Sequence, residues 1–138
     1  VVTQFQGDAI LATFNVPIAD ANHARNAIHA ALKMLNTVDV NIYEGEKLNI
    51  RIGINTGRVV AGAIGAKGRL NYTVHGDAVN LAARLEALNK EYGTRLMISE
   101  SSAASIDDVE LSRIGEATAR GQTRSIALYT IDSATTKQ

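Results

Sequence analysis

Hydrophobic positions along the chain follow two different periods, and the change of period predicts where strands give way to helices. Two short segments with strand-forming residues, 1–6 and 9–15, flank a Gly-Asp pair and predict a hairpin of two strands, the second around the apolar run at residues 9–12. Apolar residues then recur every three or four positions over residues 20–36, which predicts a helix with Asp20 as its N-cap. Strict alternation over residues 48–54 predicts the next strand.

The second half of the chain again alternates strands with a helix. Glycine-spaced residues 57–65 and the segment 70–74, which is rich in strand-forming residues, predict two extended segments. A helix is predicted over residues 78–92, with Asp77 as its N-cap and Gly93 ending it. Further elements are predicted at residues 95–99 (strand), 101–106 (short helix), and 109–114 and 125–131 (an antiparallel pair of strands). Strands interleaved with two long helices predict an α+β fold, with helices packed against a mixed or antiparallel sheet.

Composition narrows the class of protein. The 138 residues are enough for one domain with a core. The 14 basic and 14 acidic residues cancel, and no basic patch favours a nucleic-acid partner. No apolar run reaches the roughly 18 residues that a membrane span needs, so no membrane contact is expected of this domain. Cysteine is absent, which excludes disulfides and thiolate zinc sites, and a cytoplasmic location is expected.

Candidate chemistry is concentrated in two places. Asp8 follows Gly7 at the predicted hairpin turn, where a carboxylate is exposed and rigidly placed, as a magnesium ligand must be. Asn80 and Arg84 are four residues apart, so they share one face of the predicted helix. Each feature has a plainer interpretation: Gly7-Asp8 as a turn alone, and Asn80 and Arg84 as part of a solvated helix face. The glycines match no usual phosphate-binding loop, so phosphate chemistry would need metal ions and point charges.

Taken together, these segments resemble the catalytic domain of class III adenylate/guanylate cyclases of the bacterial type. The resemblance rests on the glycine-flanked Asp8, on Arg51-Ile52-Gly53-Ile54-Asn55-Thr56-Gly57 and on residues 72–86, and it covers residues 1–132. It implies the nucleotide cyclase fold with a ferredoxin-like core, and a lyase that converts ATP to 3′,5′-cyclic AMP and pyrophosphate. The family's opening strand and helices are expected to be absent, and residues 133–138 to form a C-terminal tail.

The resemblance also implies roles for individual residues. Asp8 corresponds to the second of two aspartates that hold a pair of Mg²⁺ or Mn²⁺ ions in the complete domain. Asn80 corresponds to the asparagine that orients the ribose, and Arg84 to the arginine that stabilises charge on the α-phosphate. The family supplies these groups from two chains, so a head-to-tail homodimer with shared active sites is expected. A sensor domain upstream of the cyclase domain is also expected.

Two departures from the family pattern concern the purine base. Gln4 stands where the family has a base-reading lysine, and Thr73 stands at the position of its partner. A lysine only donates hydrogen bonds, whereas an amide and a hydroxyl each donate and accept, so either purine could be satisfied. The backbone carbonyl of Val74 is expected to lie beside the adenine amino group. ATP remains the expected substrate, with weaker discrimination against GTP than a Lys/Asp pair would give.

A third departure concerns the triphosphate. The family's phosphate-binding lysine near the C-terminal hairpin falls at Gln122, which leaves Arg120 or Arg124 to bind phosphate. The substitutions at Gln4 and Gln122 favour an alternative, a degenerate cyclase domain that serves dimerisation or nucleotide sensing. The retained Asp8, Asn80 and Arg84 favour the enzyme.

Overall fold

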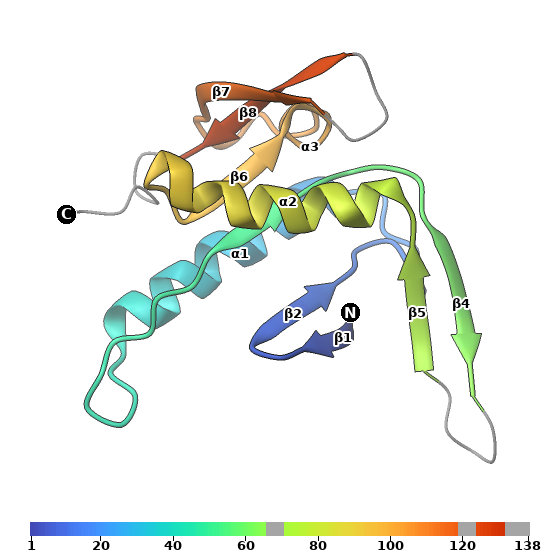
Figure 1. Ribbon diagram of the computed structural model, residues 1–138, viewed down its shortest axis with the longest axis horizontal. Helices are drawn as coiled ribbons and strands as arrows, with labels where there is room; N and C mark the ends of the chain where they lie inside the picture. The colour runs from blue at the N-terminus through green and yellow to red at the C-terminus, as the bar shows by residue number, and fades with distance from the viewer. Residues whose placement is uncertain (66–70, 119–123, 132–138) are drawn as a thin grey trace.

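The computed structural model describes residues 1–65, 71–118 and 124–131, and it confirms the α+β fold (Figure 1). Two long helices lie close to a central sheet, and two separate two-stranded ribbons complete the molecule. The elements in chain order are β1 (Val2–Gln6), β2 (Ala9–Ala12), α1 (His23–Val40), β3 (Ile52–Ile54), β4 (Val60–Ile64), β5 (Asn71–His75), α2 (Asp77–Tyr92), β6 (Leu96–Ser99), α3 (Glu100–Ala103), β7 (Ser112–Thr118) and β8 (Ser125–Thr130).

The central sheet is mixed, in the order β3-β6-β8-β7. β3 runs parallel to β6, while β8 runs antiparallel to both β6 and β7. All four residues of β6 are buried, as expected for an inner strand covered on both faces. The other strands form the β1–β2 hairpin and the antiparallel pair β4–β5, which lie outside this sheet.

The helices α1 and α2 cover opposite faces of the central sheet. Leu96 and Ile98 pack in one cluster with the buried residues of α1, whereas Met97 packs in another with Leu85 of α2. Successive side chains of a strand point to opposite faces, so the alternation along β6 places one helix on each side. In the described part of the chain, no helix is long and apolar enough to cross a membrane.

The first long helix differs from its prediction at both ends. It starts at His23, with Asn22 in the N-cap position and no side-chain cap bond, so the prediction of Asp20 as N-cap was wrong. The Asp20 carboxylate instead accepts hydrogen bonds from the Asn22 backbone N–H at 2.9 Å and from Asn26 Nδ2 at 2.7 Å. The helix continues beyond residue 36 because Val38 extends its buried stripe.

The second long helix confirms one predicted end and corrects the other. Gly93 is the C-cap, with a left-handed φ of 66°, and its N–H bonds to the carbonyl of Asn89. At the N-terminus, Gly76 is the N-cap without any side-chain bond, and Asp77 lies inside the first turn. The prediction of Asp77 as N-cap was therefore wrong, although its carboxylate still lies near the positive end of the helix dipole.

Several strands are shorter than, or shifted from, their predicted ranges. The strand predicted over 48–54 forms only at Ile52–Ile54, where the chain meets β6, and the one predicted over 109–114 forms as Ser112–Thr118. The predicted short helix is limited to Glu100–Ala103. Residues 133–138, predicted as a tail, lie outside the described residues.

Candidate active site

Asp8 lies at the tip of the β1–β2 hairpin, as predicted. Gln6 pairs with Ala9, so Gly7 and Asp8 form a two-residue turn, and Gly7 has a φ of +62° that a side chain would strain. Asp8 is exposed, and its carboxylate has no hydrogen-bond or ion-pair partner among the described residues. Carboxylate oxygens of this kind are the ligands that Mg²⁺ and Mn²⁺ prefer.

Asn80 and Arg84 lie one turn apart on α2, and both are exposed. The opposite face of the helix contains the buried residues Leu85 and Asn89. The Arg84 guanidinium donates a hydrogen bond from Nη1 to the backbone carbonyl of Thr118, at the end of β7. A hollow of about 400 Å³ adjoins this contact, lined by Arg84, Leu88, Glu91, Tyr92, Glu116, Ala117, Thr118 and Ser125.

The residues predicted to contact the base lie on two neighbouring ribbons. Gln4 is exposed on β1, and β1 lies against β5, which carries Thr73 and Val74. The Thr73 hydroxyl lies 3.4 Å from the carbonyl of Gly62, longer than the usual O–H···O bond, so this contact is weak and leaves the hydroxyl able to turn toward a ligand. Val74 is buried, with 3% of its surface exposed.

Arg124, predicted as a possible phosphate ligand, forms an ion pair with α3. Its Nη2 donates to Oε2 of Glu100 at 2.6 Å, and Oε1 of the same carboxylate accepts from the Ala127 N–H at 2.7 Å. Glu100 could not be identified from the sequence, because no local pattern connects residues 24 positions apart. Gln122 and Arg120, the other residues considered for phosphate binding, lie outside the described residues.

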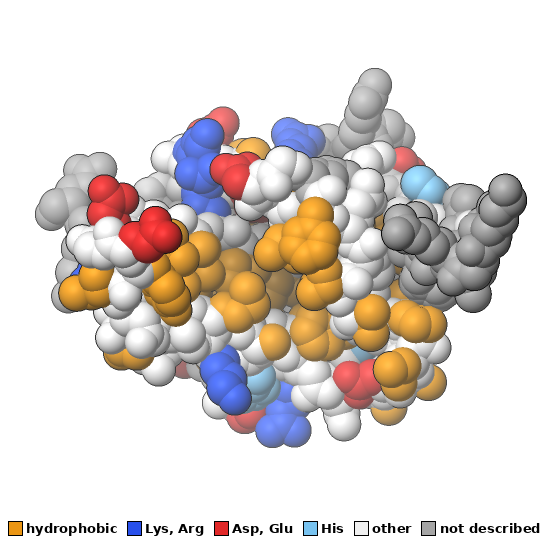
Figure 2. Space-filling view, turned by 90° about the horizontal axis from the view of Figure 1, so that it is seen from below, with side chains coloured by type: hydrophobic (Ala, Val, Ile, Leu, Met, Phe, Trp, Pro, Cys, Tyr) orange, Lys and Arg blue, Asp and Glu red, His pale blue; other side chains and the backbone are white. Residues whose placement is uncertain are grey.

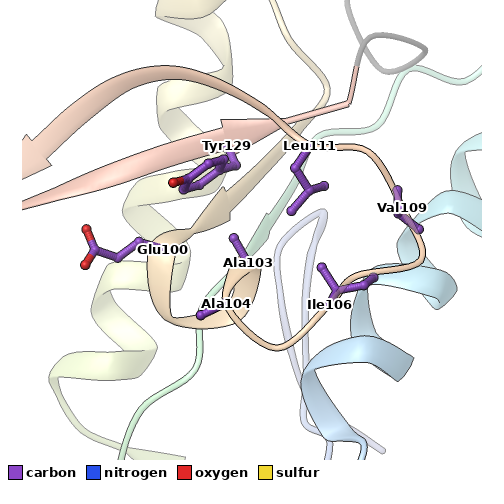
Figure 3. A pocket seen from close by; sticks show the side chains of 7 residues that line it. All are labelled: Glu100, Ala103, Ala104, Ile106, Val109, Leu111 and Tyr129. Atoms are coloured by element: carbon purple, nitrogen blue, oxygen red, sulfur yellow. The ribbon is translucent and has the colours of Figure 1, made fainter.

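A second hollow, of about 490 Å³, lies between α3, the loop after it and β8 (Figure 3). Most of the side chains that line it are aliphatic, and the carboxylate of Glu100 at its rim points away from the other side chains (Figure 3). It contains none of the predicted site residues: its lining is Glu100, Ala103, Ala104, Ile106, Val109, Leu111 and Tyr129.

Two carboxylates that link distant elements have a lowered pKa. Hydrogen bonds from Arg95 lower the pKa of Asp39, at Nη1–Oδ1 and Nη2–Oδ2 distances of 2.6 and 3.0 Å. Burial raises the pKa of Asp108, but hydrogen bonds from Arg25 and His29 outweigh it and the net shift is downward. Both carboxylates connect α1 to segments outside the candidate site, so they bear on stability.

The known proteins that this chain resembles belong to one family. Residues 3–133 match the family model of the adenylate and guanylate cyclase catalytic domain. Adenylate cyclase 1 of Rhizobium meliloti (strain 1021) is 38% identical over 136 residues, which is 94% of this chain and 20% of that protein. The terminal-differentiation-specific adenylate cyclase of Dictyostelium discoideum is 35% identical over 94% of this chain and 6% of its own length. The chain thus spans a fifth or less of these relatives.

Solved structures share the fold. The catalytic core of a rhodopsin-guanylyl cyclase with converted specificity, in complex with ATPαS, superposes with a TM-score of 0.78 at 26% identity, covering 94% of this chain and 70% of that one. The guanylate cyclase domain of RhGC from Catenaria anguillulae, in complex with GTP, gives a TM-score of 0.77 at 28% identity, covering 93% and 69%.

Proposed function

The chain belongs to the adenylate and guanylate cyclase catalytic domain family, and from this premise we propose that it converts ATP to 3′,5′-cyclic AMP and pyrophosphate. The observation that carries the proposal is the exposed pair Asn80 and Arg84 on one face of α2, within a match that spans residues 3–133. Neither side chain contributes to the buried core. The core does not require this pair, and the proposal assigns it to catalysis.

In the proposed reaction, the ribose 3′-oxygen attacks the α-phosphorus and the bond from that phosphorus to the bridging oxygen breaks. Pyrophosphate leaves with the electron pair, and the proton of the 3′-hydroxyl is lost to solvent. The Asn80 amide would hold the ribose so that its 3′-oxygen faces the α-phosphate. The Arg84 guanidinium would stabilise the negative charge that develops on the α-phosphate oxygens in the transition state. To do so, Arg84 must exchange the Thr118 carbonyl for phosphate.

Asp8 fits the role of a metal ligand, because its carboxylate is exposed at a rigid turn. It would hold Mg²⁺ or Mn²⁺, whose positive charge promotes loss of the 3′-hydroxyl proton and neutralises the leaving pyrophosphate. Among the described residues, no group of three or more His, Cys, Asp or Glu side chains could hold a metal ion. Asp8 is thus one ligand of a set that other residues must complete.

A homodimer is part of the proposal, with Asp8 of one copy facing Asn80 and Arg84 of the other. Exposed apolar side chains support an interface at the two outer ribbons: Phe5 is 74% exposed, Ile10 60% and Val60 74%. Hydrophobic side chains also gather across the underside of the molecule (Figure 2). Exposed apolar patches of this kind mark protein interfaces.

The alternative is a nucleotide-sensing or dimerisation module without turnover. Two observations favour it: Gln4 replaces a lysine of the family pattern, and Arg124 forms an ion pair with Glu100. The pair Gln4 and Thr73 at the predicted base site also supports relaxed ATP/GTP specificity in an active enzyme.

The deciding experiment measures cyclic nucleotide formed by the full-length protein from ATP and from GTP, with Mg²⁺ and with Mn²⁺. Turnover that needs the metal and is abolished in Asp8→Ala, with an unchanged Tm, is expected. Asp107→Ala, at another exposed aspartate, serves as the matched control. A dimeric wild type that binds nucleotide without turnover would establish the alternative, and full activity of Asp8→Ala would remove Asp8 from the mechanism.

A further inference from the structure

The inner face of α2 is hydrogen-bonded to β3 and its C-terminal extension through two asparagine side chains. Nδ2 of Asn55 donates to the backbone carbonyl of Ala78 at 3.0 Å, and Nδ2 of Asn89 donates to the carbonyl of Ile52 at 3.0 Å. One bond runs from the strand segment to the helix and the other runs back. Residues 78 and 89 are about three helical turns apart, so both bonds lie on the same face of α2.

Between these bonds, the backbones of α2 and β3 are in direct contact. A Cβ atom at Gly53 would lie 2.4 Å from both the carbonyl oxygen of Ala82 and the nitrogen of Glu86. Beyond the Asn55 bond, a Cβ at Gly57 would lie 2.7 Å from the Cβ of Ala78. At Gly53, the distance between helix and strand is therefore set by main-chain atoms, which have no rotamers to adjust.

Both asparagines are themselves held by neighbouring hydroxyl groups. Asn89 is 1% exposed, and its Oδ1 accepts from the Thr94 hydroxyl at 2.7 Å. The single hydroxyl proton of Ser101, in α3, is shared between the Thr56 carbonyl at 2.9 Å and Oδ1 of Asn55 at 3.3 Å, and the bond to Thr56 is the stronger one. The contact with Ser101 and the bond to Ala78 together orient the Asn55 amide, with its N–H groups toward the first turn of α2.

The contact face lies opposite Asn80 and Arg84. At about 100° per residue, each of them lies roughly 160° around the helix from Ala82, at the centre of the contact. A helix turned by one residue would aim both side chains elsewhere. Given the proposed cyclase function, on which this step rests, we infer that Asn55 is a positioning residue. Its bond to Ala78 fixes the rotation of α2, and with it the aim of Asn80 and Arg84.

Asn55→Asp tests this role, because aspartate keeps the shape and the oxygen that faces Ser101 but cannot donate to Ala78. In the full-length protein, we expect kcat to fall roughly 10- to 100-fold, since small misplacements of reacting groups cost that much. KM for ATP should stay within about 3-fold, the pattern of lost transition-state contacts. Asn55→His, which retains an N–H donor, should restore most of kcat. If the charge introduced by Asn55→Asp unfolds the protein, Asn55→Ser repeats the test without a charge, because serine is too short to reach Ala78.

The matched control is Asn36→Asp, at an exposed asparagine of α1, which should leave kcat within about 2-fold. A lowered Tm with unchanged kcat in both Asn55→Asp and Asn55→Ser would show a purely structural role and overturn the inference. A rise in KM alone would overturn it too. A wild type without cyclase activity would instead remove the proposed function, and this inference with it.

Discussion

Replacing Gly53 with alanine should both destabilise the protein and impair the proposed activity. The new methyl carbon would lie 2.4 Å from Ala82 O and Glu86 N and 3.0 Å from Glu86 Cα. Non-bonded carbon contacts are comfortable near 3.5 Å, so α2 would have to move by about 1 Å. Overpacking of this kind costs about 1–3 kcal/mol. For a domain of this size, about 4 °C per kcal/mol gives a fall in Tm of about 4–12 °C.

The same displacement would reach the candidate active site, because α2 carries Asn80 and Arg84. A misplacement of about 1 Å can cost about 100-fold in rate, so kcat of Gly53→Ala should fall more than KM rises. Thermal unfolding and cyclic nucleotide formation on the same preparation measure the two effects.

Gly62→Ala provides the matched control for stability. Nothing lies within 4 Å of a Cβ at Gly62, and its φ is not in the left-handed region. Alanine there should leave Tm unchanged or raise it slightly, since it reduces the entropy of the unfolded chain. If Gly53→Ala melted at the same temperature as Gly62→Ala, the direct contact between α2 and β3 would not exist.

Three further predictions concern charge and hydrogen bonding. Arg84→Ala should lower kcat about 100- to 1,000-fold with little change in KM, and a change confined to KM would mean that Arg84 binds ground and transition states equally. Gln4→Lys should sharpen the preference for ATP over GTP, measured as the ratio of kcat/KM values; a wild type that already rejects GTP by about 10⁴-fold would show that Gln4 and Thr73 do not read the base. Asp39→Asn should lower Tm at neutral pH, because the pKa of Asp39 is held below its ordinary value of 3.8 by Arg95. The stabilisation by the Asp39–Arg95 pair is present above that ordinary pKa and is lost as pH falls through the lower folded-state pKa. The Tm values of the wild type and of Asp39→Asn should therefore converge in acid. A Tm difference that stayed constant with pH would contradict the stabilising role of this ion pair.

Local patterns in the sequence predicted local features of the structure. The Gly7-Asp8 turn and the Gly93 cap each depend on a few adjacent residues, and both form as predicted. Asn80 and Arg84 share a helix face because their spacing alone requires it. Helix starts were harder to predict, because Asp20 has several nearby donors and bonds to Asn22 and Asn26 in a turn that precedes the helix.

Contacts between distant residues could not be predicted in the same way. Arg84 meets the Thr118 carbonyl 34 residues away, and Arg124 meets Glu100 24 residues away. Those partners depend on how α2, α3 and β7 pack, which no spacing along the chain encodes. The limits of β3 have the same origin, since the alternating stretch forms a strand only where it pairs with β6.

The position of β8 between β6 and β7 has a consequence for the order of folding. Ile98 pairs with Ile54, 44 residues earlier, and with Tyr129, 31 residues later. A chain emerging from the ribosome therefore cannot close its central sheet until β8, at Ser125–Thr130, has been synthesised, and contacts of such separation form slowly. A chain that stopped before Ser125 would leave one edge of β6 open and β7 without its partner strand. Exposed strand edges pair with other chains, so such a truncation should aggregate instead of folding into a smaller cyclase domain.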